Sequence, residues 1–190
     1  MKARLVNTHG TWRDVADAAR TTVGMEEGKG EPSSRWKTRM ILAEHSPIRL
    51  LQFTVLLEDV KSWVSVHLVR HKIGIEHFVR TQRTDRTGVN RDDLPQSSLV
   101  DHRMVLNAQA VIAISRKRLC SKASPETRAA WIRVLKAMED AEPELVAACV
   151  PDCIYRGFCF EFEPCGYNSG MLYPQALQDY RMNKSLCTAQ

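Results

Sequence analysis

Residues 70–83 read Arg-His-Lys-Ile-Gly-Ile-Glu-His-Phe-Val-Arg-Thr-Gln-Arg, and this stretch is the most informative part of the chain. It follows an apolar run with helical spacing and carries cations at both of its ends. Because guanidinium groups match phosphate oxygens in a bidentate fashion, the stretch predicts an anion-binding site for nucleotide phosphates. The alternative is a solvated basic face, since arginines gather at many exposed helix ends and loops.

The residues before this stretch predict a strand and then a helix. Apolar side chains alternate over residues 51–57, which is typical of a strand with one buried face. Helical spacing follows in Val60, Trp63, Val64, His67 and His71, so we expect His71 at the C-terminal end of a helix. The histidines His67 and His71 lie one turn apart, as in some metal sites, but packing histidines show the same spacing.

A second helix is predicted downstream, over residues 104–119. Asn107, Val111, Ile114 and Arg118 fall on one stripe of it. Asn107 and Arg118 are separated by about three turns, or roughly 16 Å. Two polar groups at the ends of an apolar stripe are suited to bracket a ligand of nucleotide size.

Other segments have plainer patterns. Residues 12–22 predict a short amphipathic helix, and the Gly-, Glu- and Ser-containing residues 24–34 predict a loop that is suited to act as a mobile lid. Ser124 followed by Pro125 is a good helix start. From Pro151 onward we expect an irregular, cysteine-rich tail.

Composition limits the classes of function. The 190 residues include 44% hydrophobic residues, enough for the core of a single domain spanning residues 1–190. A net charge of +5 and a pI near 9.0 favour anionic partners, whereas only 7% aromatic residues argue against a nucleic-acid binder that stacks bases. No window resembles a membrane span, so we expect a cytoplasmic protein that has no membrane partner.

Four cysteines stand close together in the tail: Cys149, Cys153, Cys159 and Cys165. Tetrahedral zinc would fix a tail with little regular structure, but disulfides and independent buried thiols are the alternatives, because neither half is a Cys-x-x-Cys knuckle. Cys120 lies beside Arg118, which would favour a thiolate nucleophile. No activating His–acid pair is visible, so a small packing thiol is the simpler interpretation.

The chain resembles the flavin-dependent thymidylate synthases, and the match is spread over several short elements. They follow one another along the chain: Asp14–Thr22, His45–Pro47 before Phe53–Thr54, Arg70–Lys72, Arg91 with Pro95, and Asn107–Ala108 with Arg118. This resemblance implies an α+β fold with a small, mainly antiparallel sheet flanked by helices. It also implies a homotetramer that holds FAD between subunits.

The implied reaction is reductive methylation of dUMP to dTMP, with methylenetetrahydrofolate and NADPH as co-substrates. The family pattern implies cofactor contacts from Arg70, His71, Lys72, Asn107, Ser46 and Thr22. It implies substrate contacts, to a pyrimidine nucleotide monophosphate, from Arg91, Arg118, Thr81 and Arg83. Arg118 would also take the catalytic role, because a guanidinium can stabilise negative charge at a pyrimidine carbonyl.

The chain also departs from the family pattern. The Glu and second Ser of the usual signature have no clean equivalents in residues 73–83, and the segment before Arg91 is shorter. These changes favour one alternative, a sister flavin enzyme that alkylates or hydroxymethylates another pyrimidine nucleotide. A second alternative is a zinc-containing nucleic-acid-binding protein, in which the basic stretch contacts backbone phosphates.

Overall fold

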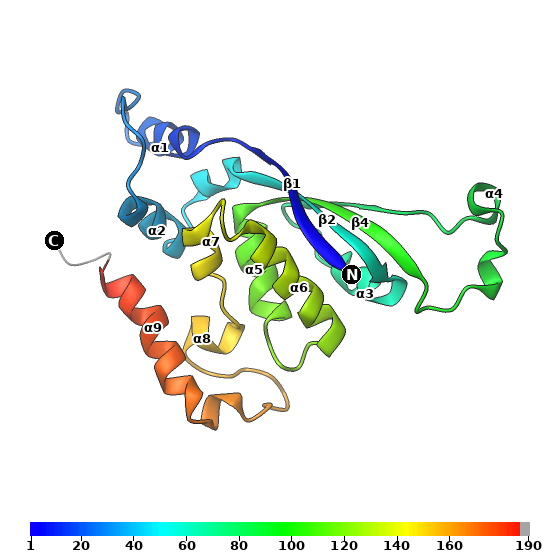
Figure 1. Ribbon diagram of the computed structural model, residues 1–190. Coiled ribbons are helices and arrows are strands. Elements are labelled where there is room, and N and C mark those ends of the chain that lie inside the picture. Colours follow the sequence, from blue (N-terminus) through cyan, green and yellow to red (C-terminus); the bar gives the residue numbers. More distant parts are fainter. Residues whose placement is uncertain (187–190) are drawn as a thin grey trace.

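The computed structural model describes the chain from residue 1 to residue 186, with side chains described through residue 182. Four antiparallel strands form one sheet in the order β1-β2-β4-β3. Helices gather around one side of this sheet, as Figure 1 shows, so the fold is α+β as expected. The strands span β1 Lys2–His9, β2 Gln52–Lys61, β3 Ile75–Val79 and β4 Leu99–Asn107.

One face of the sheet is buried under helices. In β4, Val100, His102, Met104 and Leu106 are buried and alternate with more exposed neighbours. The period of two follows from strand geometry, which directs successive side chains to opposite faces. Helices α3 and α6 pack on this face, and Trp131 of α6 is fully buried there.

The helical segments connect the strands and form the rest of the molecule. The first half of the chain contains α1 Trp12–Thr21, α2 Ser34–Leu42, η1 Ser46–Leu50, α3 Ser62–Leu68, α4 Thr84–Thr87 and η2 Arg91–Asp93. The second half contains α5 Ala108–Arg118, α6 Pro125–Met138, α7 Pro143–Ala147, α8 Asp152–Arg156, η3 Tyr167–Ser169 and α9 Leu172–Leu186. None of the helices in this described part is long and apolar enough to cross a membrane.

Local sequence signals account for several helix starts. Thr11 caps α1 in a reciprocal capping box with Asp14, and Asn107 and Ser124 accept backbone N–H groups at the starts of α5 and α6. Pro125 occupies the first turn of α6, where its missing N–H costs no intrahelical bond. The predicted helices at α1 and α6 and the loop after α1 are confirmed.

Other boundaries differ from the prediction. Residues 104–107 belong to β4 and not to the following helix, because they pair with β2 and, up to residue 106, with β3. Val60 still lies in β2, and α3 ends at Leu68, so His71 lies three residues beyond the last helical residue. At Val60 and in residues 104–106, apolar side chains fit both periodicities, and strand pairing decides between them.

The tail is more regular than expected. It contains α8 and the 15-residue helix α9. Tyr173 anchors α9: its ring is buried, and its hydroxyl donates to the Cys153 carbonyl at 3.1 Å. Tyr155 of α8 lies against the Arg116 guanidinium, 3.4 Å from ring centroid to Cζ, which attaches the tail to α5. The prediction of an irregular tail is therefore wrong for these segments.

Residues 80–98 form an arm between β3 and β4. Figure 1 shows the arm extending beyond the sheet on the side opposite α1 and α2, with α4 near its tip. Hydrogen bonds hold the arm together internally: the Arg91 amide donates to Thr84 Oγ1 at 3.1 Å, and Gly88 N–H donates to the Thr84 carbonyl at 2.9 Å.

Candidate functional site

Arg118 is the centre of the candidate site, which we call the arginine–histidine cluster and define as His67, Arg70, His71 and Arg118. The Arg118 Nε–H donates to His71 Nε2 at 2.9 Å, and its Nη2 donates to the His67 carbonyl at 2.6 Å. The last turn of α5 thereby meets the end of α3. Because both contacts come from one rigid guanidinium plane, Arg118 fixes the His71 ring relative to the helix end.

Burial and like charges lower the pKa values in this cluster. Burial is the main cause that lowers the pKa of His71 to about 4, and the charge of Arg118 adds to it. His71 is therefore neutral near pH 7, and its Nε2 accepts the bond from Arg118. Burial and then the nearby Arg70 charge also lower the pKa of Arg118, although it stays protonated.

The cations here are not balanced by carboxylates. Within the part of the chain that the structure describes, Arg70, Lys72 and Arg118 form no ion pair with an acidic side chain. A partly buried guanidinium without a counter-ion attracts anions strongly, because solvent screens its charge poorly. The arrangement is therefore chemically suited to bind a phosphate or another anionic group.

Arg70, Lys72 and the apolar Ile73 are exposed next to this centre, and Ile73 is 91% exposed. The segment continues to Gly74, which meets Asn107 at the other end of α5. Asn107 N–H donates to the Gly74 carbonyl at 2.9 Å. Residues 70–74 thus run along α5 from its C-terminal end to its N-cap, and they bring the predicted cofactor residues Arg70, His71, Lys72 and Asn107 to one side of the molecule.

Asn107 is occupied by a structural bond. Its Oδ1 accepts the Ala110 N–H at 2.9 Å and so caps α5. Gly74 has φ +72°, and a Cβ on it would lie 2.7 Å from Asn107 Nδ2. The amide Nδ2 of Asn107 is the group left to contact a ligand, because Oδ1 is engaged by the helix.

A second row of polar side chains lies beneath the cluster and was not predicted from the sequence. The His77 Nε2 atom lies 2.8 Å from the His71 carbonyl, and its Nδ1 lies 2.9 Å from Nε2 of the buried His102. Ser65 Oγ lies 3.1 Å from the other ring nitrogen of His102. A histidine within the alternating buried positions of β4 was the available signal, because a buried polar side chain requires partners.

The predicted substrate residues of the arm lie apart from the cluster of their own chain. Thr81, Arg83 and Arg91 are exposed along the arm, which projects away from α5 (Figure 1). Arg83 forms two 2.9 Å hydrogen bonds with the Asp85 carboxylate. A single chain therefore brings Arg70, His71 and Arg118 together, but not the three arm residues.

Two further predicted residues lie at exposed positions. Thr22 follows α1, and its hydroxyl donates to the Ala19 carbonyl at 2.7 Å. Ser46 is the first residue of η1. Within the described part of the chain, neither side chain hydrogen-bonds to the arginine–histidine cluster.

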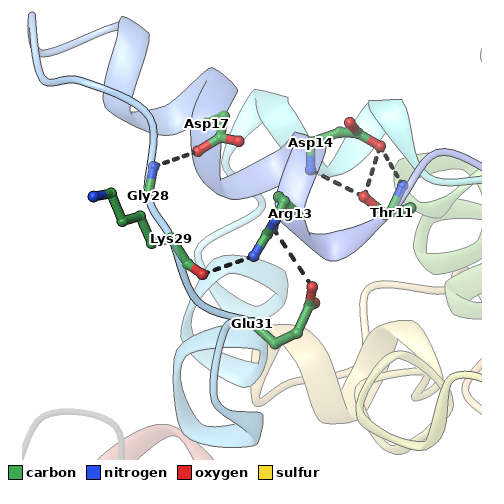
Figure 2. Close-up of polar contacts among 7 residues, drawn as sticks. All are labelled: Thr11, Arg13, Asp14, Asp17, Gly28, Lys29 and Glu31. Carbon is green, nitrogen blue, oxygen red and sulfur yellow. Dashed lines mark hydrogen bonds and ion pairs between the residues drawn. The ribbon is translucent and has the colours of Figure 1, made fainter.

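The predicted lid, residues 24–34, is docked on α1. Figure 2 shows Gly28 N–H donating to Asp17 Oδ1 at 2.9 Å and Arg13 donating to the Lys29 carbonyl at 2.9 Å. Arg13 also pairs with Glu31 at 3.6 Å. The loop, α1 and Trp36 of α2 enclose a cavity of about 510 Å³, and no residue of the arginine–histidine cluster lines it.

The cysteines do not form the predicted zinc site. In the described residues no group of three His, Cys, Asp or Glu side chains is placed to hold a metal ion. Cys149 lies in the core, where burial raises the pKa of its thiol to about 12. Cys120 instead joins Cys153, Cys159 and Cys165 around a cavity of about 270 Å³, and these described cysteines are free thiols. Burial raises the pKa of Cys120, which favours the packing interpretation over a nucleophile.

The alternative roles of the two histidines are also resolved by their contacts. His67 Nδ1 lies 3.0 Å from Thr127 Oγ1, and His71 Nε2 accepts from Arg118. Each imidazole ring is therefore hydrogen-bonded to a neighbouring helix. These contacts fit packing histidines better than a pair of metal ligands.

Comparisons with known proteins give a likeness in structure only. No protein-family model matches the chain, and no curated protein matches it in sequence. A solved flavin-dependent thymidylate synthase from Helicobacter pylori, complexed with FAD and dUMP, superposes with a TM-score of 0.66 at 12% identity. The alignment covers 79% of this chain and 100% of that chain.

Two further solved structures agree. Another structure of the Helicobacter pylori enzyme with FAD and dUMP gives a TM-score of 0.65 at 12% identity, covering 79% of this chain and 99% of that chain. A UMP/dUMP methylase, PolB from Streptomyces cacaoi bound with 5-Br dUMP, gives 0.62 at 16% identity, covering 83% and 95%. The chain therefore has the fold of the flavin-dependent thymidylate synthases, at only 12–16% sequence identity to these three structures.

Proposed function

We propose that this protein is a flavin-dependent methyltransferase that converts dUMP to dTMP, with methylenetetrahydrofolate as carbon donor and NADPH as reductant. One observation carries the proposal: the cations around Arg118 lack acidic partners in the described chain, and the fold is shared with an enzyme solved with FAD and dUMP. Anionic ligands would supply the missing negative charge.

The residues present fit a flavin. Arg70 and Lys72 are exposed cations suited to its phosphates. The exposed Ile73, which follows Lys72, offers apolar surface to a flavin ring. His71 Nε2 accepts from Arg118, so the proton of the neutral ring is on Nδ1. In the described residues this Nδ1–H donor has no hydrogen-bond partner. When bound, FAD supplies the redox chemistry, while the protein binds and orients.

Arg118 is proposed to hold the nucleotide. Its fixed guanidinium is partly desolvated, so a hydrogen bond from it to an anionic ligand is stronger than the same bond in water. A charge held at a pyrimidine carbonyl edge would stabilise negative charge that develops on the ring. This electrostatic role needs neither proton transfer from Arg118 nor movement of the side chain.

We propose further that the arm completes the site in a homotetramer. The arm that carries Arg91, Arg83 and Thr81 projects away from the cluster of its own chain, and in the proposed assembly it would reach the cluster of a neighbouring chain. The interface would then supply the substrate contacts that a single chain lacks.

A sister reaction on another pyrimidine nucleotide is the second candidate. The altered segment 75–83 favours it, because the Glu and the second Ser of the family signature have no clean equivalents there. A substrate titration separates the two candidates, since the ring substituent at position 4 distinguishes dUMP from dCMP.

The decisive experiment is to purify the protein, record its visible spectrum, and titrate FAD and then dUMP, UMP and dCMP by flavin fluorescence. We expect a flavin absorbance band and a response to a uridine nucleotide. The Arg118→Ala variant should lose nucleotide binding by at least tenfold, as expected for a charge-assisted bond worth about 1.5–3 kcal/mol.

Lys117→Ala provides the matched control. Lys117 is an exposed cation on the same helix, paired with Asp152 at 3.6 Å, so its loss changes net charge equally without touching the cluster. A colourless protein that binds neither FAD nor any of the nucleotides would refute the proposal. Equal losses in both variants would refute the specific role of Arg118.

A further inference from the structure

A directed chain of hydrogen bonds joins the core to the candidate site. It runs from Ser65 in α3 through His102 in β4 and His77 in β3 to the His71 carbonyl, with separations of 3.1, 2.9 and 2.8 Å. His102 is fully buried and His77 is half-buried. These three side chains are not among the residues to which the proposed function assigns a ligand contact.

The carbonyl end of the chain fixes the direction of every bond in it. A carbonyl oxygen only accepts, so His77 Nε2 carries the proton that it donates to His71. In a neutral His77 ring, Nδ1 then accepts, and His102 Nε2 must carry the next proton. His102 Nδ1 is left as the acceptor for the Ser65 hydroxyl.

The environment supports a neutral His102 ring at the buried end of this chain of hydrogen bonds. Burial, followed by the charge of His77, lowers the pKa of His102 to about 4. The groups that face this pair are His71 from the segment after α3, Ser65 from α3 and, through His71, the Arg118 guanidinium from α5. No carboxylate hydrogen-bonds to either ring in the described residues.

The last bond acts on the backbone of the site. His71 lies beyond the end of α3, where its amide bonds the Leu68 carbonyl at 3.1 Å. The bond from His77 holds the other side of the same residue. The backbone N–H and the carbonyl of His71 are therefore both hydrogen-bonded. This fixed backbone lets the His71 ring keep its Nε2 against Arg118 and leaves Nδ1–H for a ligand.

We propose that His77 is a positioning residue that, with His102 behind it, fixes the His71 carbonyl and thereby the His71–Arg118 pair for ligand binding. This inference rests on the proposed function for its ligand, FAD, but not for its geometry. His77 of β3 lies outside the arginine–histidine cluster, and the inference gives it a defined effect on FAD binding.

Two substitutions separate the effects of the two hydrogen bonds that His77 makes, one to the His71 carbonyl and one to His102. His77→Gln can place an amide N–H near the position of Nε2 and so donate to the His71 carbonyl, while it loses the acceptor for His102. His77→Asn can place an oxygen near the position of Nδ1 and so accept from His102, while it loses the bond to His71. Each variant loses one of the two hydrogen bonds, so the pair controls for bond loss in general.

We expect His77→Asn to weaken FAD binding about threefold to tenfold, which corresponds to one net hydrogen bond, and His77→Gln to keep the affinity within about twofold. Urea unfolding of both variants measures the purely structural loss, which we expect to be similar. Equal affinity loss in the two variants, or none in either, would overturn the positioning role.

Long-range ¹H–¹⁵N NMR spectra of the wild-type protein test the geometry without any ligand. We expect Nε2–H tautomers for His77 and His102 and an Nδ1–H tautomer for His71, and we expect the His71 ring signals to shift in His77→Asn more than in His77→Gln. A different tautomer of His77 would overturn the inference. If the wild-type protein binds no FAD while these tautomers are found, the proposed function fails and the positioning of His71 stands.

Discussion

Replacement of Gly74 by alanine tests whether the 70–74 segment and the α5 cap depend on one another. Gly74 has φ +72°, in the left-handed region that residues with a Cβ adopt only at a cost. Its added methyl group would lie 2.7 Å from Asn107 Nδ2, 2.8 Å from Oδ1 and 3.0 Å from Cγ. Contacts this short require the Asn107 side chain to move.

The expected loss has two parts. The left-handed backbone costs an alanine about 1 kcal/mol. Displacement of Asn107 breaks its bond to the Ala110 N–H, and loss of an N-cap costs about 1 kcal/mol. We therefore expect Gly74→Ala to lower the free energy of unfolding by about 2 kcal/mol.

Gly88→Ala is the matched control. Gly88 has the same φ of +72°, but an added Cβ there would meet nothing within 4 Å. This variant carries the backbone cost without the contact, so we expect a loss of about 1 kcal/mol. Any gain from a stiffer unfolded chain applies to both alanine variants and cancels in the comparison.

Urea unfolding followed by circular dichroism measures these values, with Asn107→Ala and the double variant closing a cycle. In the double variant the Asn107 side chain is already gone, so the N-cap bond is lost only once. Its loss in free energy of unfolding should therefore be about 1 kcal/mol smaller than the sum for Gly74→Ala and Asn107→Ala. Additive losses, or equal losses for Gly74→Ala and Gly88→Ala, would show that Gly74 does not act through Asn107.

Three further predictions concern the cluster and the cysteines. Arg118→Ala should raise the pKa of His71 from about 4 toward its ordinary value by removing a nearby positive charge, and an NMR titration that found it unchanged would contradict the assignment. Because the folded-state pKa values of His71 and His102 are both lowered to about 4, stability should be complete above pH 6.5 and fall progressively toward pH 4, as urea midpoints across this range will show. With a maleimide reagent and mass spectrometry, exposed Cys165 should react readily and buried Cys149 only on unfolding; early labelling of Cys149 would contradict its place in the core.

Patterns that depend on nearest neighbours predicted parts of the fold well. The start of α6 at Ser124 and Pro125, and the amphipathic helix α1, follow from capping and periodicity. The antiparallel sheet and the α+β class were expected from the family resemblance. Strand β1 and the strand character of β3 were not predicted, because their side chains become partly buried only after pairing with β2 and β4.

Only part of the candidate site was predicted, because local patterns do not show which distant residues come together. Arg70, His71 and Arg118 do meet, and helical spacing together with the resemblance pointed to them. The distribution of the cysteines could not be predicted, because Cys149 and Cys153 are four apart in sequence but face different surroundings. Cys149 enters the core beside Ser115, whereas Cys153 lines the cavity with Cys120.

The polar chain beneath the cluster shows why spacing alone could not find the residues that support a site. His77 and His102 are 25 residues apart, and the arm separates them in sequence. They meet because β3 and β4 pair with Val79 opposite His102, which places His77 diagonally across from it on the same face. A shift of one residue in this pairing would turn His77 to the other face and leave the His71 carbonyl without its donor. Under the positioning role proposed for His77, the register of these two strands sets the geometry of His71 and Arg118, and ligand binding by these residues depends on the pairing of β3 with β4.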